Sequence, residues 1–231
     1  MKIRLGDLRQ IIREVVGGDQ MALYTWSNSS SDIKVVLYSP VELFALDWPD
    51  VYELPKEVVK GYASFSKTDE PCNGAWQVSS IAGIGYGKTL YGLGYYLAPG
   101  GRLMPDRMFT SKRARSAWTA ALGRGKLKGF PLDDISEPRT EDPNDDCELQ
   151  VPTKKGGPDP VLDVAYEGPP VDPGPMMQVH KDTVVKLMKI LRDLDTEYTN
   201  PSEVEDMLGG MLKSVSTKYF TSEFGKYYKE K

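Results

Sequence analysis

A glycine-rich stretch near the middle of the chain has the residue types and spacing of a phosphate-binding loop. It runs from Ala82 to Thr89 and reads AGIGYGKT. An apolar segment of β-strand character precedes it, and TLYGLGYYLA follows at helical spacing. A loop between a strand and a helix N-terminus offers backbone amides to an anion, and the helix dipole favours negative charge there. The sequence therefore predicts a phosphate site formed by Gly83, Gly85, Tyr86, Gly87, Lys88 and Thr89.

The same stretch matches a relaxed P-loop pattern of nucleoside triphosphatases, with Ala82 in place of the first glycine. The flanking elements do not favour that interpretation. The following helix contains Gly92 and Gly94, and the next strand, RLMPD, is broken by Pro105. A P-loop fold instead needs a buried apolar strand at this point, because such parallel strands are covered on both faces.

The loop must be positioned by the elements on either side of it. Alternating apolar residues and turn residues predict strands, and apolar residues three or four apart predict helices. Ser111 is a good N-cap for a helix that begins just after it. We expect helices at 3–16, 87–98 and 111–122, and strands at 32–39, 41–48, 58–66, 74–81 and 102–106.

These central segments resemble the central half of the GNAT superfamily of acyl-CoA-dependent N-acyltransferases. Similar GYG…LY, L.PDR and DDC stretches occur in a group of GNAT-like proteins encoded by tailed bacteriophages. Here they are Gly85-Tyr86-Gly87 with Leu90-Tyr91, Leu103-Met104-Pro105-Asp106-Arg107, and Asp145-Asp146-Cys147. The resemblance implies an α+β fold with a mixed, mainly antiparallel sheet flanked by helices. It also implies acetyl-CoA as cofactor, with its pyrophosphate on the glycine-loop amides and its pantetheine arm along the preceding strand.

Two positions depart from the family pattern. Ala82 stands where the family's loop has glutamine or arginine, and Trp118 stands where the last helix often carries the tyrosine that protonates the departing thiolate. An indole N–H donates hydrogen bonds but is no acid near neutral pH. The remaining candidates are phenols for the proton donor and carboxylates for the base. They are Tyr91 and Tyr95, and Asp106, Glu53 and Glu57.

Two functions follow from this resemblance and remain open. The first is an acetyl-CoA-dependent N-acetyltransferase that acts on an amine, by positioning the reactants and polarising the thioester carbonyl. The second is a GNAT-fold phage protein that has lost the chemistry and serves as an interaction or virion component. In the second case, a protein partner or a second copy would dock on the N-terminal helix and on residues 176–231.

The chain is expected to have three parts. Residues 1–130 form the acyl-CoA-binding core with its N-terminal amphipathic helix. Residues 131–175 contain ten of the 17 prolines and read as a linker or surface-wrapping segment, with one strand expected at 161–167. Residues 176–231 carry apolar stripes at helical spacing and form a C-terminal helical extension.

Several classes of protein are disfavoured by composition. The single histidine, His180, rules out multi-histidine zinc motifs, and we interpret it as a helix-surface residue. Cys72 and Cys147 form no metal-binding or disulfide-framework spacing, so we expect free thiols, with one long-range pair as the alternative. EDPNDDCE fails as a calcium loop, because cysteine replaces the required glycine. No metal is expected. The absence of a long apolar run predicts a cytoplasmic protein, in the host cytoplasm if phage-encoded, or a virion-associated one, with no membrane partner.

Charge is strongly segregated along the second half of the chain. Residues 102–128 carry a net charge of +7 and residues 133–148 a net charge of −7, within an overall charge of −4. The simplest interpretation is that the acidic segment folds back over the basic helix. A nucleic-acid partner is accordingly not expected.

Overall fold

The computed structural model describes most of the chain between residues 20 and 193. The helix expected at 3–16 lies outside the described residues, as do the apolar stripes expected after residue 203. The described residues are 20–45, 58–83, 85–106, 110–136, 138–148, 160–193, 202, 206, 209 and 210.

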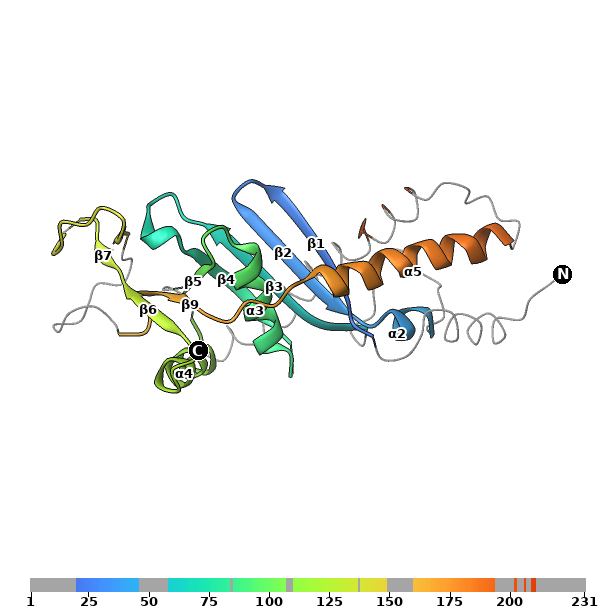
Figure 1. Ribbon diagram of the computed structural model, residues 1–231, viewed down its shortest axis with the longest axis horizontal. Helices are drawn as coiled ribbons and strands as arrows, with labels where there is room; N and C mark the ends of the chain where they lie inside the picture. Colours follow the sequence, from blue (N-terminus) through green and yellow to red (C-terminus); the bar gives the residue numbers. More distant parts are fainter. Residues whose placement is uncertain are drawn as a thin grey trace, which may run out of the picture. The chain divides into compact units, whose positions relative to one another are not determined.

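These residues form an α+β fold with a mixed, mostly antiparallel sheet, which confirms the coarse fold class (Figure 1). The seven strands follow the order β1-β2-β3-β4-β5-β9-β6. β4 and β5 are parallel, whereas β9 is antiparallel to both β5 and β6. The strands are β1 (Ala22–Ser29), β2 (Asp32–Tyr38), β3 (Val59–Lys67), β4 (Trp76–Ala82), β5 (Arg102–Pro105), β6 (Lys128–Pro131) and β9 (Val164–Glu167).

Helices and short elements fill the connections between these strands. β7 and β8 form a separate two-stranded parallel pair. The remaining elements are α2 (Pro40–Ala45), η1 (Cys72–Gly74), α3 (Gly87–Leu97), α4 (Lys112–Gly123), β7 (Asp133–Asp134), β8 (Asp146–Cys147) and α5 (Gly174–Asp193).

The chain divides into two compact units, and β1, β2 and β3 each contribute residues to both. Unit 1 comprises residues 1–25, 36–62 and 173–231, and unit 2 comprises residues 26–35 and 63–172. Unit 2 therefore contains the whole of the strand–loop–helix–strand–helix order that was expected around the glycine loop.

In unit 2, α3 packs against the sheet at a distance that only glycine allows. A Cβ on Gly94 would lie 2.5 Å from Phe65 Cε1 and 2.8 Å from Leu103 Cδ1. On the same helix, the carbonyl of Gly92 accepts a 2.9 Å hydrogen bond from the amide of Val171. Gly92 and Gly94, which are unusual in a P-loop helix, thus allow α3 to pack closely against its neighbours.

A disulfide joins two distant parts of unit 2. Cys72 of η1 and Cys147 of β8 are bonded to each other and fully buried, so the expectation of free thiols was wrong. Their sulfurs lie in a small core with Met104, Leu132 and Ala165. The strands between them bring together cysteines that are 75 residues apart in sequence.

Unit 1 buries the chain's histidine, so the prediction of a helix-surface residue was also wrong. His180 of α5 is 5% exposed, and its Nδ1 lies 2.8 Å from the Tyr38 hydroxyl in a hydrogen bond. The ring of Tyr24 lies 5.3 Å from the imidazole, centroid to centroid. Val184, one turn along α5, is buried as well. The first half of α5 is therefore part of a core and not an appended surface helix.

The segment 41–48 was expected as a strand, but its described part belongs to the short helix α2. Pro40 occupies the first helical position, where its missing N–H is no loss. The Ser39 hydroxyl accepts a 3.4 Å hydrogen bond from the Glu42 amide, as a capping residue does. This start signal overrides the alternating apolar pattern.

Candidate functional site

The glycine loop connects β4 to α3, as the sequence predicted. Gly85 has φ +85°, a left-handed conformation that glycine adopts without strain. A Cβ on Gly85 or on Gly87 would meet nothing within 4 Å, so the loop faces open space on this side. Lys88 is exposed, whereas Gly83, Tyr86, Gly87 and Thr89 are half-buried.

The N-terminus of α3 has backbone N–H groups that make no hydrogen bond within the helix. The first i−4 bond at this end runs from the Leu90 amide to the Tyr86 carbonyl at 3.0 Å. Gly87, Lys88 and Thr89 precede that bond, so their amides have no partner within α3. Tyr86 is the N-cap residue, and its side chain makes no capping hydrogen bond. With Lys88, these amides form a donor set suited to a phosphate or diphosphate.

β4 continues beyond its parallel neighbour before it enters the loop. Its pairing with β5 comprises Trp76–Leu103, Gln77–Met104 and Val78–Pro105. Pro105 has no N–H and ends β5. Residues 79–82 of β4 therefore extend past the last residue pair with β5, toward the carboxyl end, where open sheets that contain parallel strands bind their ligands.

Trp118 forms an aromatic stack within unit 2. It is 4% exposed, its ring lies 4.8 Å from that of Tyr166, and Tyr91 meets it edge-on at 4.9 Å. Burial raises the pKa of Tyr91 to about 12. Burial, together with Tyr91 and Tyr166, also raises the pKa of Tyr95, which is 5% exposed. Both phenols are thus poorer acids than free tyrosine.

Of the three carboxylate candidates, only Asp106 belongs to the described residues. Asp106 directly follows β5 and is half-buried, and its carbonyl accepts a 3.0 Å hydrogen bond from the Thr110 amide. Glu53 and Glu57 lie outside the described residues. Arg102, at the start of β5, has its Nε 3.9 Å from a carboxylate oxygen of Glu167 on β9.

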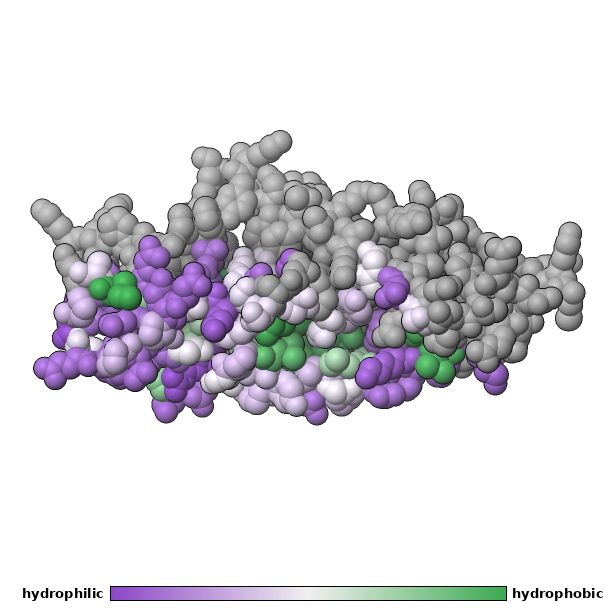
Figure 2. Space-filling view, turned by 90° about the horizontal axis from the view of Figure 1, so that it is seen from above, coloured by the Kyte–Doolittle hydropathy of each residue, from purple (hydrophilic) through white to green (hydrophobic). Residues whose placement is uncertain are grey.

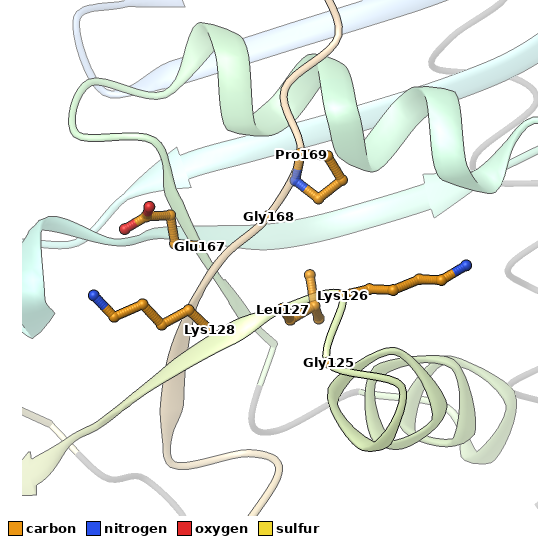
Figure 3. A pocket seen from close by; sticks show the side chains of 7 residues that line it. All are labelled: Gly125, Lys126, Leu127, Lys128, Glu167, Gly168 and Pro169. Atoms are coloured by element: carbon orange, nitrogen blue, oxygen red, sulfur yellow. The ribbon is translucent and has the colours of Figure 1, made fainter.

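Two surface pockets lie away from the glycine loop. One, of about 420 Å³, is lined by residues 125–128 and 167–169, where the α4–β6 connection meets the end of β9 (Figure 3). Figure 3 shows Lys126 and Lys128 extending in opposite directions, with Glu167 on the side of Lys128. The other, of about 530 Å³, lies beside η1 and includes Asn73, Arg102 and Asn144. Neither of these two pockets is lined by residues of the glycine loop.

The acidic segment is held at η1, which contradicts the expectation that it covers the basic helix. The Asn73 amide donates to the Asn144 carbonyl at 2.6 Å, beside the disulfide. Figure 1 shows β7 well apart from α4 within unit 2. Hydrophilic residues predominate over the part of unit 2 that carries β6 and β7, at the left of Figure 2.

Asp133 organises this acidic segment. Its carboxylate accepts hydrogen bonds from the backbone amides of Asp134, Arg139 and Thr140. Burial acts to raise the pKa of Asp133, but these three bonds and the charge of Arg139 outweigh it and hold the pKa below its ordinary value. Asp145 and Asp146 have carboxylate oxygens within 4.8 Å of that of Asp133. The sequence offered no signal for this arrangement beyond its charge.

Comparison with known proteins gives no match. No protein-family model, no curated protein and no solved structure matches this chain. Among the described residues, none of the helices has the length and apolar character needed to cross a bilayer.

Proposed function

We propose that this chain is a GNAT-like protein that binds acetyl-CoA at the glycine loop and transfers the acetyl group to an amine. The observation that carries the proposal is the course of β4, which runs past the end of β5 and into a glycine loop at a helix N-terminus. That arrangement could accommodate a ligand that has an extended arm and a diphosphate. The arm would lie along residues 79–82, and the diphosphate on the amides of Gly87, Lys88 and Thr89.

The main contribution of the protein to catalysis would be to position the thioester and the amine. When bound, the thioester supplies an activated acyl group. Backbone amides of residues 79–82 would polarise its carbonyl, and the exposed Lys88 ammonium would balance the diphosphate charge. An amine held beside β4 would form the amide bond as the thioester carbon–sulfur bond breaks, and the proton that the amine loses would pass, through water, to the departing coenzyme thiolate.

A second candidate is a coenzyme-free protein of the same fold that acts as an interaction or virion component. The observation that favours it is the stack of Trp118 between Tyr91 and Tyr166. The proton donor of the family is replaced there by a residue with a packing role, and the pKa of Tyr91, about 12, makes it a weak substitute. Val185 on α5 is 66% exposed and offers a contact for a partner.

Calorimetric titration with acetyl-CoA separates the two candidates. Gly87→Leu fills the open space at the loop without meeting any neighbour within 4 Å at its Cβ, so it should weaken binding at least tenfold with an unchanged melting temperature. Gly123→Leu is the matched control, because Gly123 on α4 also has open space around its Cβ. No heat from wild-type protein, or equal heats from both variants, would contradict the proposal.

Turnover is a separate measurement. A protein that binds acetyl-CoA and releases its thiol in the presence of an amine is the enzyme. A protein that binds acetyl-CoA and releases no thiol with any of a panel of amines is a coenzyme-binding protein without the chemistry. If the wild type does not bind acetyl-CoA, the coenzyme-free candidate predicts association by light scattering that Val185→Asp abolishes.

A further inference from the structure

Helix α4 exposes most of its surface. Of its 12 residues, only Trp118 is buried. Ala114, Ala121 and Leu122 are half-buried, and the other eight are exposed. The helix therefore contacts unit 2 along one narrow stripe and leaves a broad face to solvent.

This exposed face is basic, and the stretch of sequence that forms it contains no acidic residue. No aspartate or glutamate occurs from residue 107 to residue 132. Exposed bases stand at both ends of α4 and just beyond it: Lys112, Arg113, Arg115, Arg124 and Lys126.

The bases in the first turn of α4 do not serve helix stability. Lys112 and Arg113 stand at the N-terminal end of the helix dipole, where cations are disfavoured and carboxylates are preferred. The first turn carries no acidic residue. Because cations at this position lower helix stability, their placement calls for a different explanation. Binding of an anion is such an explanation.

Between the bases, the exposed face carries only small side chains. Arg113, Ala117, Ala120 and Arg124 follow one another at spacings of four, three and four residues, and thus share a face. The adjacent hydroxyls of Ser116 and Thr119 donate to helix carbonyls, each at 2.9 Å. None of the large hydrophobic residues exposed in the described part of the chain lies on α4.

That surface suits a phosphate backbone better than a protein. Protein interfaces rely on buried aromatic and large apolar residues, and this face offers none. Twelve residues of helix extend about 18 Å, the length of several phosphates along a strand, and small side chains let the backbone approach. The acidic segment lies at η1 and leaves α4 uncovered.

We propose that the exposed basic face of α4, with Lys126 beyond its C-terminal end, binds the phosphate backbone of a nucleic acid without reading its sequence. Lys112, Arg113, Arg124 and Lys126 supply phosphate contacts, and no asparagine or glutamine that could read adenine accompanies them on the helix. The proposal is independent of the coenzyme site, because it uses a different helix of unit 2.

The test measures binding of full-length protein to a fluorescent 20-base-pair DNA duplex by anisotropy. If about four phosphates are contacted, affinity should fall roughly 150-fold between 50 and 200 mM NaCl. Arg113→Gln with Arg124→Gln should weaken binding at least tenfold at 50 mM and reduce the salt slope by about two. Lys181→Gln with Lys189→Gln, an equal loss of exposed charge on α5, should leave both unchanged.

Arg113→Lys with Arg124→Lys keeps the charge and should retain binding, which separates an electrostatic effect from a folding defect. The proposal is overturned if the wild type does not bind at 50 mM NaCl, or if the two charge-neutralised pairs bind equally well. It is also overturned if polyglutamate displaces the duplex at lower charge concentration than unlabelled DNA does, because the face would then prefer an acidic protein.

Discussion

The disulfide between Cys72 and Cys147 gives the sharpest prediction about stability. Both cysteines are fully buried, and they are 75 residues apart in sequence. A cross-link of that span removes conformational entropy from the unfolded chain, and the loop-closure relation puts its stabilisation at about 4.5 kcal/mol at 25 °C. That is a large fraction of the stability of an ordinary domain, which is about 5–15 kcal/mol.

The assay is urea unfolding of wild-type protein with and without reductant, followed by fluorescence. Reduction keeps both sulfur atoms in the core, so it isolates the cross-link from the cavity that a Cys→Ala pair would add. The reduced protein should lose about 3–5 kcal/mol, and its urea m-value should rise because its unfolded chain is more expanded. Equal stabilities within about 1 kcal/mol, or two free thiols in non-reduced protein by mass spectrometry, would refute the reasoning.

Three further predictions concern packing and ionisation. Gly94→Ala should destabilise the protein by about 1–3 kcal/mol in urea unfolding, because its Cβ would overlap neighbouring side chains, while Gly123→Ala on open α4 should cost nothing. Tyr91 should lower the stability by about 2 kcal/mol as the pH rises from 10 to 12, because its folded pKa, about 12, lies above its unfolded value. Tyr91→Phe should reduce the decline in urea midpoints without removing it, because burial also raises the pKa of Tyr95, and an unchanged decline would exclude a contribution from Tyr91. The lowered pKa of Asp133 means that its carboxylate stabilises the fold above pH 4, and this stabilisation is lost as the pH falls further. Asp133→Asn should remove the stabilisation and speed hydrogen exchange of the Thr140 amide at pH 5. Equal exchange rates in the two proteins would contradict this role of Asp133.

Local signals predicted the segment around the glycine loop well. α3 begins at Gly87 and α4 at Lys112, within a residue of expectation. Ser111 caps α4 through a 3.2 Å hydrogen bond from the Ala114 amide. Caps and apolar spacing depend only on residues close in sequence, so they can be interpreted without knowledge of the tertiary structure.

Features that depend on distant partners were missed. β6, β7 and β8 are only two to four residues long, and pairing with neighbouring strands defines them more than their own sequence does. The disulfide could not be inferred from a spacing of 75 residues. It also weighs against the predicted cytoplasmic location, since structural disulfides persist mainly in oxidising compartments.

For the candidate site, the sequence predicted the loop but not its surroundings. His180 could have been placed in a core, because Thr183 and Val184 lie three and four residues further along the same helix face. The stack of Trp118 on Tyr166 had no comparable signal, since Tyr166 comes from β9, a strand that follows a proline-rich segment.

The central claim is that backbone amides at the start of α3 hold the diphosphate of coenzyme A. An NMR titration of ¹⁵N-labelled protein with coenzyme A observes those amides one by one. Saturable shifts should be concentrated at Gly85, Gly87, Lys88 and Thr89, and pantetheine, which lacks the diphosphate, should cause none of comparable size. Unmoved loop amides at saturating coenzyme, or shifts confined to the pocket at residues 125–128, would contradict it.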